Sequence, residues 1–306
     1  MTRNCLIWIV ICFVATISSS HGEMEIVDVT SEHLPLNRNR RSTNHDISYF
    51  YYQSGEYPRD CQEVFDQCEG DSLDSGVYLI QPVGAKEPFE VLCNNSIDEG
   101  RWTVLQRRMD GSIDFYRYWD EYKNGFGFLN TEFWLGNDKI ALLTNQKNYE
   151  LRIDITDRHG SSYFAKYNLF RISDEQSKYR LVNIDGYDST SSVGIDRMSW
   201  HKNKLFSTRD QDNDGWSDYH CAEKHVGAWW FGHYYYQPSS TTCANDYYCE
   251  FFPVGGGGCV QCGPFHSNGD YDGSTRGTNM FWDDLRDGRN NDCGLMYTDL
   301  KIRPTS

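Results

Sequence analysis

Short segments with strand-like composition follow one another along most of this chain, and they constrain its fold more than any other feature. They are GVYLIQPV (76–83), PFEVLC (88–93), RWTVLQRR (101–108), NYELRIDI (148–155) and SYFAKYNLFRI (162–172). Only CQEVFDQC (61–68) and NTEFWLGNDKIALLT (130–144) are typical of helices, the second capped by Asn130 or Thr131 and with an apolar side of Phe133, Trp134, Ile140 and Leu143. Strands and helices without βαβ alternation predict an α+β fold with an antiparallel sheet.

The N-terminus has the pattern of a secreted precursor. Arg3 precedes a run of twelve apolar residues, Leu6 to Ile17, and small residues follow it, so we expect a signal peptide over 1–20. The segment 21–41 ends in RNRR (38–41), which is either a furin-type cleavage site closing a propeptide or a basic patch in an exposed linker. Residues 42–57 are predicted to be a linker. No later stretch is apolar and long enough to insert into a membrane.

Charge and cysteine content agree with an extracellular protein. Of 29 basic and 44 acidic residues, four of each lie in 1–41, which leaves 25 against 40 and a net charge of −15. Such acidity argues against nucleic acid or anionic membrane as the main partner. Eleven cysteines minus Cys5 and Cys12 of the leader leaves nine, which in an oxidising compartment predicts disulfides and one odd thiol.

A series of ordered motifs resembles the fibrinogen C-terminal globular domain, the family of fibrinogen chains, ficolins, tachylectins and angiopoietins. The motifs are PRDCQEVF, SGVYLIQP, PFEVLC, RWTVLQRRMDGSIDFYRYWDEYKNGFG, TEFWLGNDKI, FSTRDQDNDGW, CAEKHVGAWW and LKIRP. The resemblance covers 58–304 and is interrupted between 230 and 262. It implies a twisted antiparallel sheet, short flanking helices and a long loop-rich region that binds calcium and ligand. It also implies core positions for five tryptophans, namely Trp102, Trp119, Trp134, Trp229 and Trp230.

The segment RDQDNDGWSDYHC (209–221) has the residue types of a calcium loop. Asp210, Asp212, Asp214 and Gly215 fill positions one, three, five and six of an EF-hand loop, but position twelve is Cys221 instead of the bidentate glutamate. From the residues alone, a different calcium site and a metal-free acidic turn both remain open.

Resemblance to the fibrinogen-like domains favours the calcium site. In that family one Ca²⁺ is held by carboxylates and backbone carbonyls of this loop. Transferred by position, the carboxylates are those of Asp212 and Asp214, and the carbonyls are those of Trp216 and Asp218. The distance to the cysteine is one residue longer here than in the family, so the carbonyl positions could shift by one.

The same resemblance implies two disulfides. One is Cys61–Cys93, and the other is Cys221–Cys262, with Cys221–Cys243 as its rival. Between Cys221 and Cys262 lies a predicted insertion at about 234–261. Four cysteines near its end (Cys243, Cys249, Cys259 and Cys262) raise the alternative of a zinc site, although only one C-x₂-C pair is present and secretion favours disulfides.

The insertion CANDYYCEFFPVGGGGCVQCGPF is similar to the intelectins, secreted calcium-dependent lectins with a C-x₅-C pair, a Gly₄ run and a Q-C-G-x-F segment in that order. The Asn and His that bind calcium and sugar in intelectins correspond here to Ala244 and Tyr247. Asn245 and Asp246 could supply oxygen ligands in their place.

The ficolin and tachylectin sugar pocket is also altered here. That pocket lies beside the calcium loop and is built from aromatic side chains. His225 occupies a usual aromatic position, and His266 and Phe281 are further candidates for its wall. For His225 the alternative is an ordinary surface imidazole.

Two functions follow as hypotheses. The first is a secreted calcium-dependent lectin of innate immunity, binding glycans on microbial or cell surfaces. The alternative is a protein ligand of the angiopoietin or fibrinogen kind that binds an extracellular receptor or matrix protein. An enzyme is not expected, because no G-x-S-x-G, H-E-x-x-H or Walker motif occurs.

Two further sites concern covalent chemistry. Cys68 is extra relative to the plain fibrinogen-like pattern and forms a C-x₆-C with Cys61 whose intelectin counterpart links chains, so we expect a disulfide-linked homo-oligomer through Cys68. Internal pairing of Cys68 with Cys293 or an insertion cysteine is the alternative. Asn94 begins the chain's one N-x-S/T sequon, and we expect it to carry an N-glycan.

Overall fold

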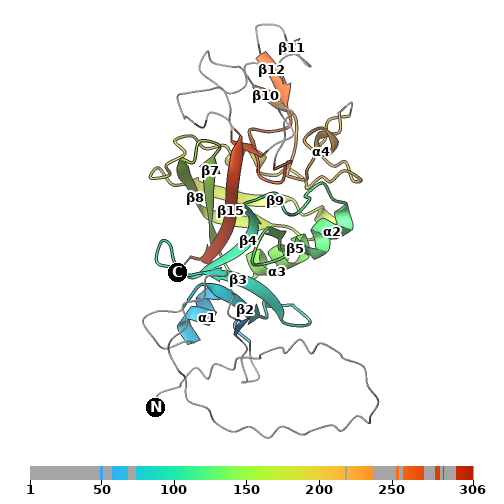
Figure 1. The fold of residues 1–306 in the computed structure, drawn as a ribbon. Helices are drawn as coiled ribbons and strands as arrows, with labels where there is room; N and C mark the ends of the chain where they lie inside the picture. Colours follow the sequence, from blue (N-terminus) through green and yellow to red (C-terminus); the bar gives the residue numbers. More distant parts are fainter. Residues whose placement is uncertain are drawn as a thin grey trace, which may run out of the picture.

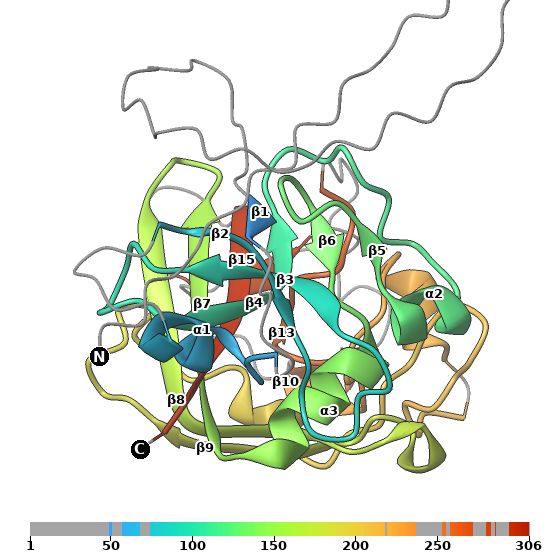
Figure 2. The ribbon, with the colours of Figure 1, turned by 90° about the horizontal axis from the view of Figure 1, so that it is seen from below.

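A ten-stranded sheet organises the described part of the chain (Figures 1 and 2). The computed structural model describes residues 49–50, 57–67, 74–217, 219–236, 253–254, 258–271, 280–282, 285 and 294–305. For 49–50, 234–236, 253–254 and 258–261 only the backbone is described. No helix in these ranges is long and apolar enough to cross a membrane.

The C-terminal strand lies in the middle of the sheet. Its order is β1 (Tyr49–Phe50), β2 (Gly76–Ile80), β3 (Phe89–Asn94), β4 (Trp102–Arg108), β15 (Leu295–Pro304), β7 (Tyr149–Asp157), β8 (Ser162–Ile172) and β9 (Leu181–Tyr187). β5 (Phe126–Gly127) and β6 (Phe133–Trp134) extend it beside β4. Except for β1 with β2, every pairing is antiparallel, as the sequence predicts. Figure 2 shows β15 between β4 and β7.

Short helices and small strand pairs complete the domain. The helices are α1 (Cys61–Gln67), α2 (Trp119–Asn124), α3 (Asn137–Gln146) and α4 (Cys221–Lys224), with 3₁₀ turns η1 (Glu175–Ser177) and η2 (Ser199–His201). The loop-rich part contributes β10 (Tyr234–Tyr236), β11 (Pro253–Val254), β12 (Gly258–Gln261), β13 (Phe265–His266) and β14 (Phe281–Trp282). This α+β architecture is the predicted fold class.

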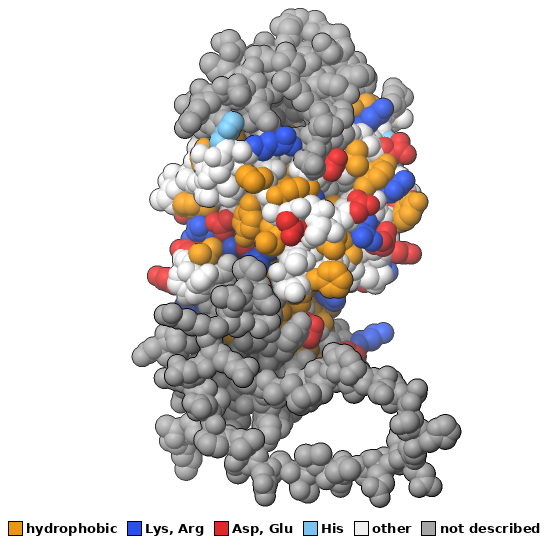
Figure 3. All heavy atoms as spheres, viewed as in Figure 1, with side chains coloured by type: hydrophobic (Ala, Val, Ile, Leu, Met, Phe, Trp, Pro, Cys, Tyr) orange, Lys and Arg blue, Asp and Glu red, His pale blue; other side chains and the backbone are white. Residues whose placement is uncertain are grey.

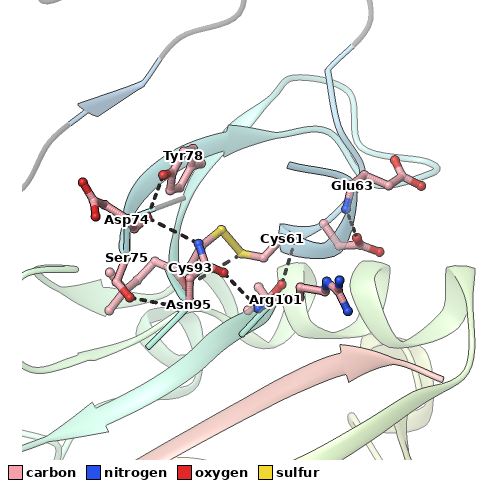
Figure 4. Close-up of a disulfide and its surroundings, with 11 residues drawn as sticks. Cys61, Glu63, Asp74, Ser75, Tyr78, Cys93, Asn95 and Arg101 are labelled. Carbon is pink, nitrogen blue, oxygen red and sulfur yellow. Dashed lines mark hydrogen bonds between the residues drawn. A yellow bond between two sulfur atoms is a disulfide. The ribbon is translucent and has the colours of Figure 1, made fainter. Parts of the chain in front are cut away.

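The Cys61–Cys93 disulfide ties α1 to the end of β3 (Figure 4), and it is the pair that the resemblance implies. Both cysteines are fully buried. The Cys61 backbone N–H also donates to Thr103 Oγ1 on β4 at 3.2 Å. One covalent and one polar contact therefore fix α1 against the sheet.

Aromatic side chains fill the core between the sheet and the loop-rich region. All five tryptophans predicted for the core are buried. Trp134 stacks on Phe206 with ring centroids 5.9 Å apart, Trp229 meets Trp230 at 5.0 Å, and Phe265 meets Trp282 at 4.7 Å. Such pairs combine area burial with favourable ring geometry. The core therefore continues under the region that the resemblance associates with ligand binding.

The helix predicted over 130–144 is wrong in its first half. Phe133 and Trp134 form β6, which pairs with β4 and β5, and α3 begins only at Asn137. Gly136 separates the two elements with φ 112°, and a Cβ there would lie 2.7 Å from the Asn124 backbone. Only glycine fits this junction. The expected apolar residues are buried as predicted, but on two elements instead of one helix face.

Candidate functional site

The three aspartates of the acidic loop have different roles. Asp210 is engaged with other parts of the chain: its Oδ1 accepts hydrogen bonds from the Trp119 backbone N–H at 2.9 Å and from Thr208 Oγ1 at 2.7 Å. Asp212 is exposed. Asp214 is only 6% exposed and accepts two backbone N–H groups, from Trp216 at 2.8 Å on Oδ1 and from Cys221 at 2.9 Å on Oδ2. Asp210 thus anchors the loop to α2, while Asp212 and Asp214 are the acids left for a ligand.

Electrostatics in this loop favour a cation. The pKa of Asp214 is raised to about 6, mainly by burial and to a smaller extent by the neighbouring Asp212 carboxylate, and the two backbone N–H donors oppose this rise. Among the described residues no Lys or Arg pairs with either acid. Two close carboxylates without a basic partner would gain from a bound positive charge.

The residues present fit a hard divalent cation such as Ca²⁺. Two carboxylates and the Trp216 carbonyl on one tight loop are the oxygen donors that Ca²⁺ takes. Gly215 has φ 77°, which favours glycine at this turn. Within the described ranges, no three His, Cys, Asp or Glu side chains converge as a metal site, so further ligands would be carbonyls and water. Asp218, expected to supply one carbonyl, lies outside the described residues.

A second disulfide joins the end of this loop to the segment after the insertion. It links Cys221 with Cys262, so the expected pair is present and the rival with Cys243 is wrong. Because Cys262 is consumed in this bond, it cannot serve the four-cysteine zinc site considered from the sequence. Cys68, Cys243, Cys249 and Cys293 lie outside the described residues, and Cys259 is described only in its backbone, on β12.

A buried polar network positions the segment that follows Cys262. Gln106 Nε2 donates to Ser267 Oγ and to Asn268 Oδ1, both at 2.8 Å, and Thr298 Oγ1 donates to Gln106 Oε1 at 2.9 Å. Arg108 Nη1 donates to the Gly269 carbonyl at 2.7 Å. Side chains of β4 and β15 thus hold residues 267–269 against the sheet.

This placement brings the three candidate ligand residues together. His225 lies 5.2 Å from His266 and 5.9 Å from Phe281 between ring centroids, and Phe281 lies 5.0 Å from His266. Phe231 stacks on His225 at 5.3 Å. His225 is 1% exposed, so the alternative of a surface imidazole is wrong. In this structure the cluster is an interior wall and not an open surface.

The turn that carries His225 is strained. Val226 has φ 49°, a left-handed conformation that is uncommon for a β-branched residue. The following Gly227 lies so close to the Asn268 carbonyl that a Cβ would approach it to 2.2 Å. Residues held this way cost about 1–3 kcal/mol and cluster at functional sites. No local feature of the sequence signals this strain.

An aromatic and arginine surface beside the loop has no local signature in the sequence. Arg209 Cζ lies 4.0 Å from the Tyr116 ring centroid and 4.9 Å from that of Tyr118, which is 52% exposed. Farther along the same loop, the half-buried Trp216 ring meets those of Tyr219 at 4.7 Å and His233 at 4.9 Å. These six residues, with Asp212, are called the loop surface below. Their separation in sequence hides the grouping.

The predicted insertion lies mostly outside the described residues. Its described backbone forms the small sheet β10–β12–β11. The resemblance of this segment to intelectins therefore stays a prediction.

Comparisons with known proteins agree with the architecture. The chain matches the family described as fibrinogen beta and gamma chains, C-terminal globular domain, over residues 57–304. It is similar to fibrinogen-like protein A of Apostichopus parvimensis, with 46% identity over 200 residues covering 64% of this chain and 69% of the relative. It is similar to angiopoietin-related protein 1 of Homo sapiens, with 40% identity over 173 residues covering 56% of this chain and 34% of the relative. The chain thus spans about a third of that relative's length.

Solved structures share the fold. The fibrinogen-like globe domain of human ANGPTL2 aligns with a TM-score of 0.65 and 30% identity, covering 81% of this chain and 100% of that one. Lamprey fibrin D-dimer, complexed with the peptide ligand Gly-His-Arg-Pro-amide, aligns with a TM-score of 0.60 and 32% identity, covering 82% of this chain and 74% of that one. With a family match over nearly the whole described region, this chain belongs to the fibrinogen C-terminal globular domain family.

Proposed function

We propose that this chain is a secreted protein ligand whose fibrinogen-like globe binds an extracellular receptor or matrix protein through the loop surface. The observation that carries the proposal is that the acidic loop takes part in two aromatic groups: Arg209 lies over the Tyr116 and Tyr118 rings, and Trp216 packs on Tyr219. Tyrosine, tryptophan and arginine dominate binding energy at protein interfaces. An arginine that already contacts two rings loses less freedom when a partner binds, which lowers the entropic cost of binding.

The relatives and the surface composition support a protein partner. Angiopoietin-related proteins are among the relatives, and the lamprey fibrin globe was solved with a peptide ligand. On the face shown in Figure 3, hydrophobic, acidic and basic side chains of the described residues are interspersed. Such a mixed surface suits short-range recognition of another protein better than attraction of a polyanion.

Calcium would order this surface. Asp214 accepts the backbone N–H of Trp216, and Asp210 accepts that of Trp119, which follows Tyr118 directly. A Ca²⁺ held by Asp212 and Asp214 would neutralise the two carboxylates and restrain the loop between the two aromatic groups. Binding of the partner should therefore depend on calcium.

Glycan recognition is the second candidate. It is favoured by the convergence of His225, His266 and Phe281, with His225 only four residues after the end of the acidic loop. Their burial weighs against it, since an acetyl group or sugar ring needs an open pocket.

Two arrays, each with and without EDTA, separate the candidates. The purified chain is applied to an array of extracellular receptor and matrix domains and to a glycan array. Calcium-dependent signal on a protein spot alone supports the ligand function. Calcium-dependent signal confined to defined sugars contradicts it and supports the lectin.

A further inference from the structure

The turn between β3 and β4 contains the sequon Asn94-Asn95-Ser96, and its geometry separates the roles of the two asparagines. Asn94 lies at the end of β3 next to Cys93, is half-buried, and pairs with Trp102 across the sheet. Its Oδ1 accepts hydrogen bonds from the Ser96 backbone N–H at 3.1 Å and from Ser96 Oγ at 2.9 Å. The serine hydroxyl and the asparagine amide of the sequon are thus already in contact.

Asn95 has a structural role. Its Nδ2 donates to the Asp74 carbonyl at 3.3 Å, and its Oδ1 accepts the Arg101 backbone N–H at 2.9 Å (Figure 4). Its own backbone N–H donates to Ser75 Oγ at 2.8 Å. Both ends of the Asn95 side chain are therefore occupied in closing the turn.

The Asn94 amide nitrogen is not used in this way. Among the described residues, none accepts a hydrogen bond from Asn94 Nδ2, whereas its Oδ1 is doubly bonded. Ser96 is exposed, and so are Asp98 and Glu99 farther along the turn. A group attached to Asn94 Nδ2 would displace no described hydrogen bond.

The turn itself is rigid and strained. Asp98, Glu99 and Arg101 all have positive φ, at 46°, 66° and 69°. Asp98 Oδ2 holds the turn against the sheet through Lys166 Nζ at 3.0 Å and Arg152 Nη1 at 3.5 Å. The acceptor asparagine therefore lies at a fixed surface position and not in a mobile tail.

We infer that Asn94 is an N-glycosylation site and that its glycan stands away from the loop surface. The inference rests on the secretion that is part of the proposed function. In the transfer, Asn94 Nδ2 bonds to the anomeric carbon of an oligosaccharide carried on a lipid diphosphate. The bond from that carbon to the diphosphate oxygen breaks, the lipid diphosphate leaves, and one Nδ2 proton passes to a base of the transferase.

The position of the glycan fits a binding function at the other end of the globe. β3 and α1 lie in the lower half of Figure 1, and α4, which follows the acidic loop, lies in the upper half. A bulky glycan on β3 would shield the sheet end without covering the loop surface. Removing the glycan should leave partner binding unchanged.

The test is peptide mapping of the full chain purified from the medium of cultured eukaryotic cells. We expect a peptide N-glycosidase to lower the apparent mass in one step and to convert Asn94 to Asp. Asn94→Gln and Ser96→Ala should each abolish the shift, whereas Ser96→Thr should retain it. Asn95→Ala keeps the sequon but removes the closing side chain, so it should still be glycosylated.

A second arm separates this inference from the proposed function. The chain is also expressed with residues 1–20 replaced by a cleavable heterologous secretion leader. Unmodified Asn94 in protein secreted by this route overturns the glycosylation site, and so does a persistent shift in Ser96→Ala. If the chain with its own residues 1–20 fails to reach the medium and the chain with the heterologous leader does reach it, secretion of the native chain is contradicted. Glycosylation of Asn94 in the second chain then still supports the site.

Discussion

The carboxylate of Asp214 accepts the backbone N–H of Cys221 at 2.9 Å, and this bond joins the acidic loop to the disulfide with Cys262. Through that disulfide the loop is connected to residues 267–269 and to the polar network of β4 and β15. A short series of contacts therefore connects the proposed cation site with the segment that contains His266, one of the residues packed around His225.

Calcium should stabilise the globe through Asp212 and Asp214. At a hundredfold excess over its dissociation constant, a ligand that binds only the folded state adds about 2.7 kcal/mol to the free energy of unfolding. Asp212→Ala combined with Asp214→Ala should abolish the calcium-dependent rise in melting temperature. Asp210→Asn is the matched control, since Asp210 anchors α2, and it should keep the response. An unchanged response in the double variant places the ion elsewhere.

Acid should destabilise the fold through His201. Burial lowers the pKa of His201 to about 4, and its Nδ1 lies 2.8 Å from the Trp230 carbonyl. Since the unfolded pKa is about 6.5, the unfolded state binds more protons between these values, so stability falls as pH falls from about 6.5 to 4. The loss from this residue is about 3 kcal/mol.

His201→Gln keeps a donor for the Trp230 carbonyl but does not titrate. Urea unfolding at a series of pH values should give it a flatter slope between pH 6.5 and 4 than the native chain shows. Equal slopes for the two proteins would remove His201 as the cause.

Relieving the turn at Val226 should stabilise the protein. Val226→Gly removes a left-handed β-branched residue, and we expect a gain of about 1 kcal/mol in the free energy of unfolding. Val226→Ala, which keeps most of the strain, should change stability less. Denaturant midpoints measure both. A destabilised glycine variant would show that the Val226 side chain contributes packing that outweighs its backbone strain.

Cys68 should link chains. Removal of the expected signal peptide, residues 1–20, would leave nine cysteines, so at least one could not pair within a chain. Non-reducing gels should show a dimer or larger species that Cys68→Ser removes, while Cys61 and Cys93 remain bonded to each other. A monomeric native chain contradicts the prediction and favours internal pairing of Cys68.

Much of the central sheet could be predicted from the local composition of the sequence. The five strand-like segments became β2, β3, β4, β7 and β8, because alternating apolar residues and turn residues are local signals. The change from strand β6 to helix α3 between Phe133 and Asn137 could not be predicted from such local signals. It depends on the close approach of Gly136 to Asn124, which only the packed structure creates.

In the candidate site too, features set by local sequence were predicted and features created by packing of distant segments were not. Asp212 and Asp214 were recognisable because their spacing is local. The stack of Arg209 on Tyr116 and Tyr118 was not, since residues about ninety positions apart meet only after α2 docks on the loop. The burial of His225 and His266 also depends on the Cys221–Cys262 bond and on Gln106, far away in the chain.

The most direct test of the central claim is the affinity of the globe for a partner found on the receptor and matrix array, measured by surface plasmon resonance in calcium. Tyr118→Ala combined with Arg209→Ala should weaken binding at least about tenfold, the effect of an interface hot spot. Val83→Ala combined with Lys86→Ala, on the exposed β2–β3 turn, is the control and should bind like the native chain. Native affinity in the Tyr118 and Arg209 variant would contradict the claim that the loop surface binds the partner.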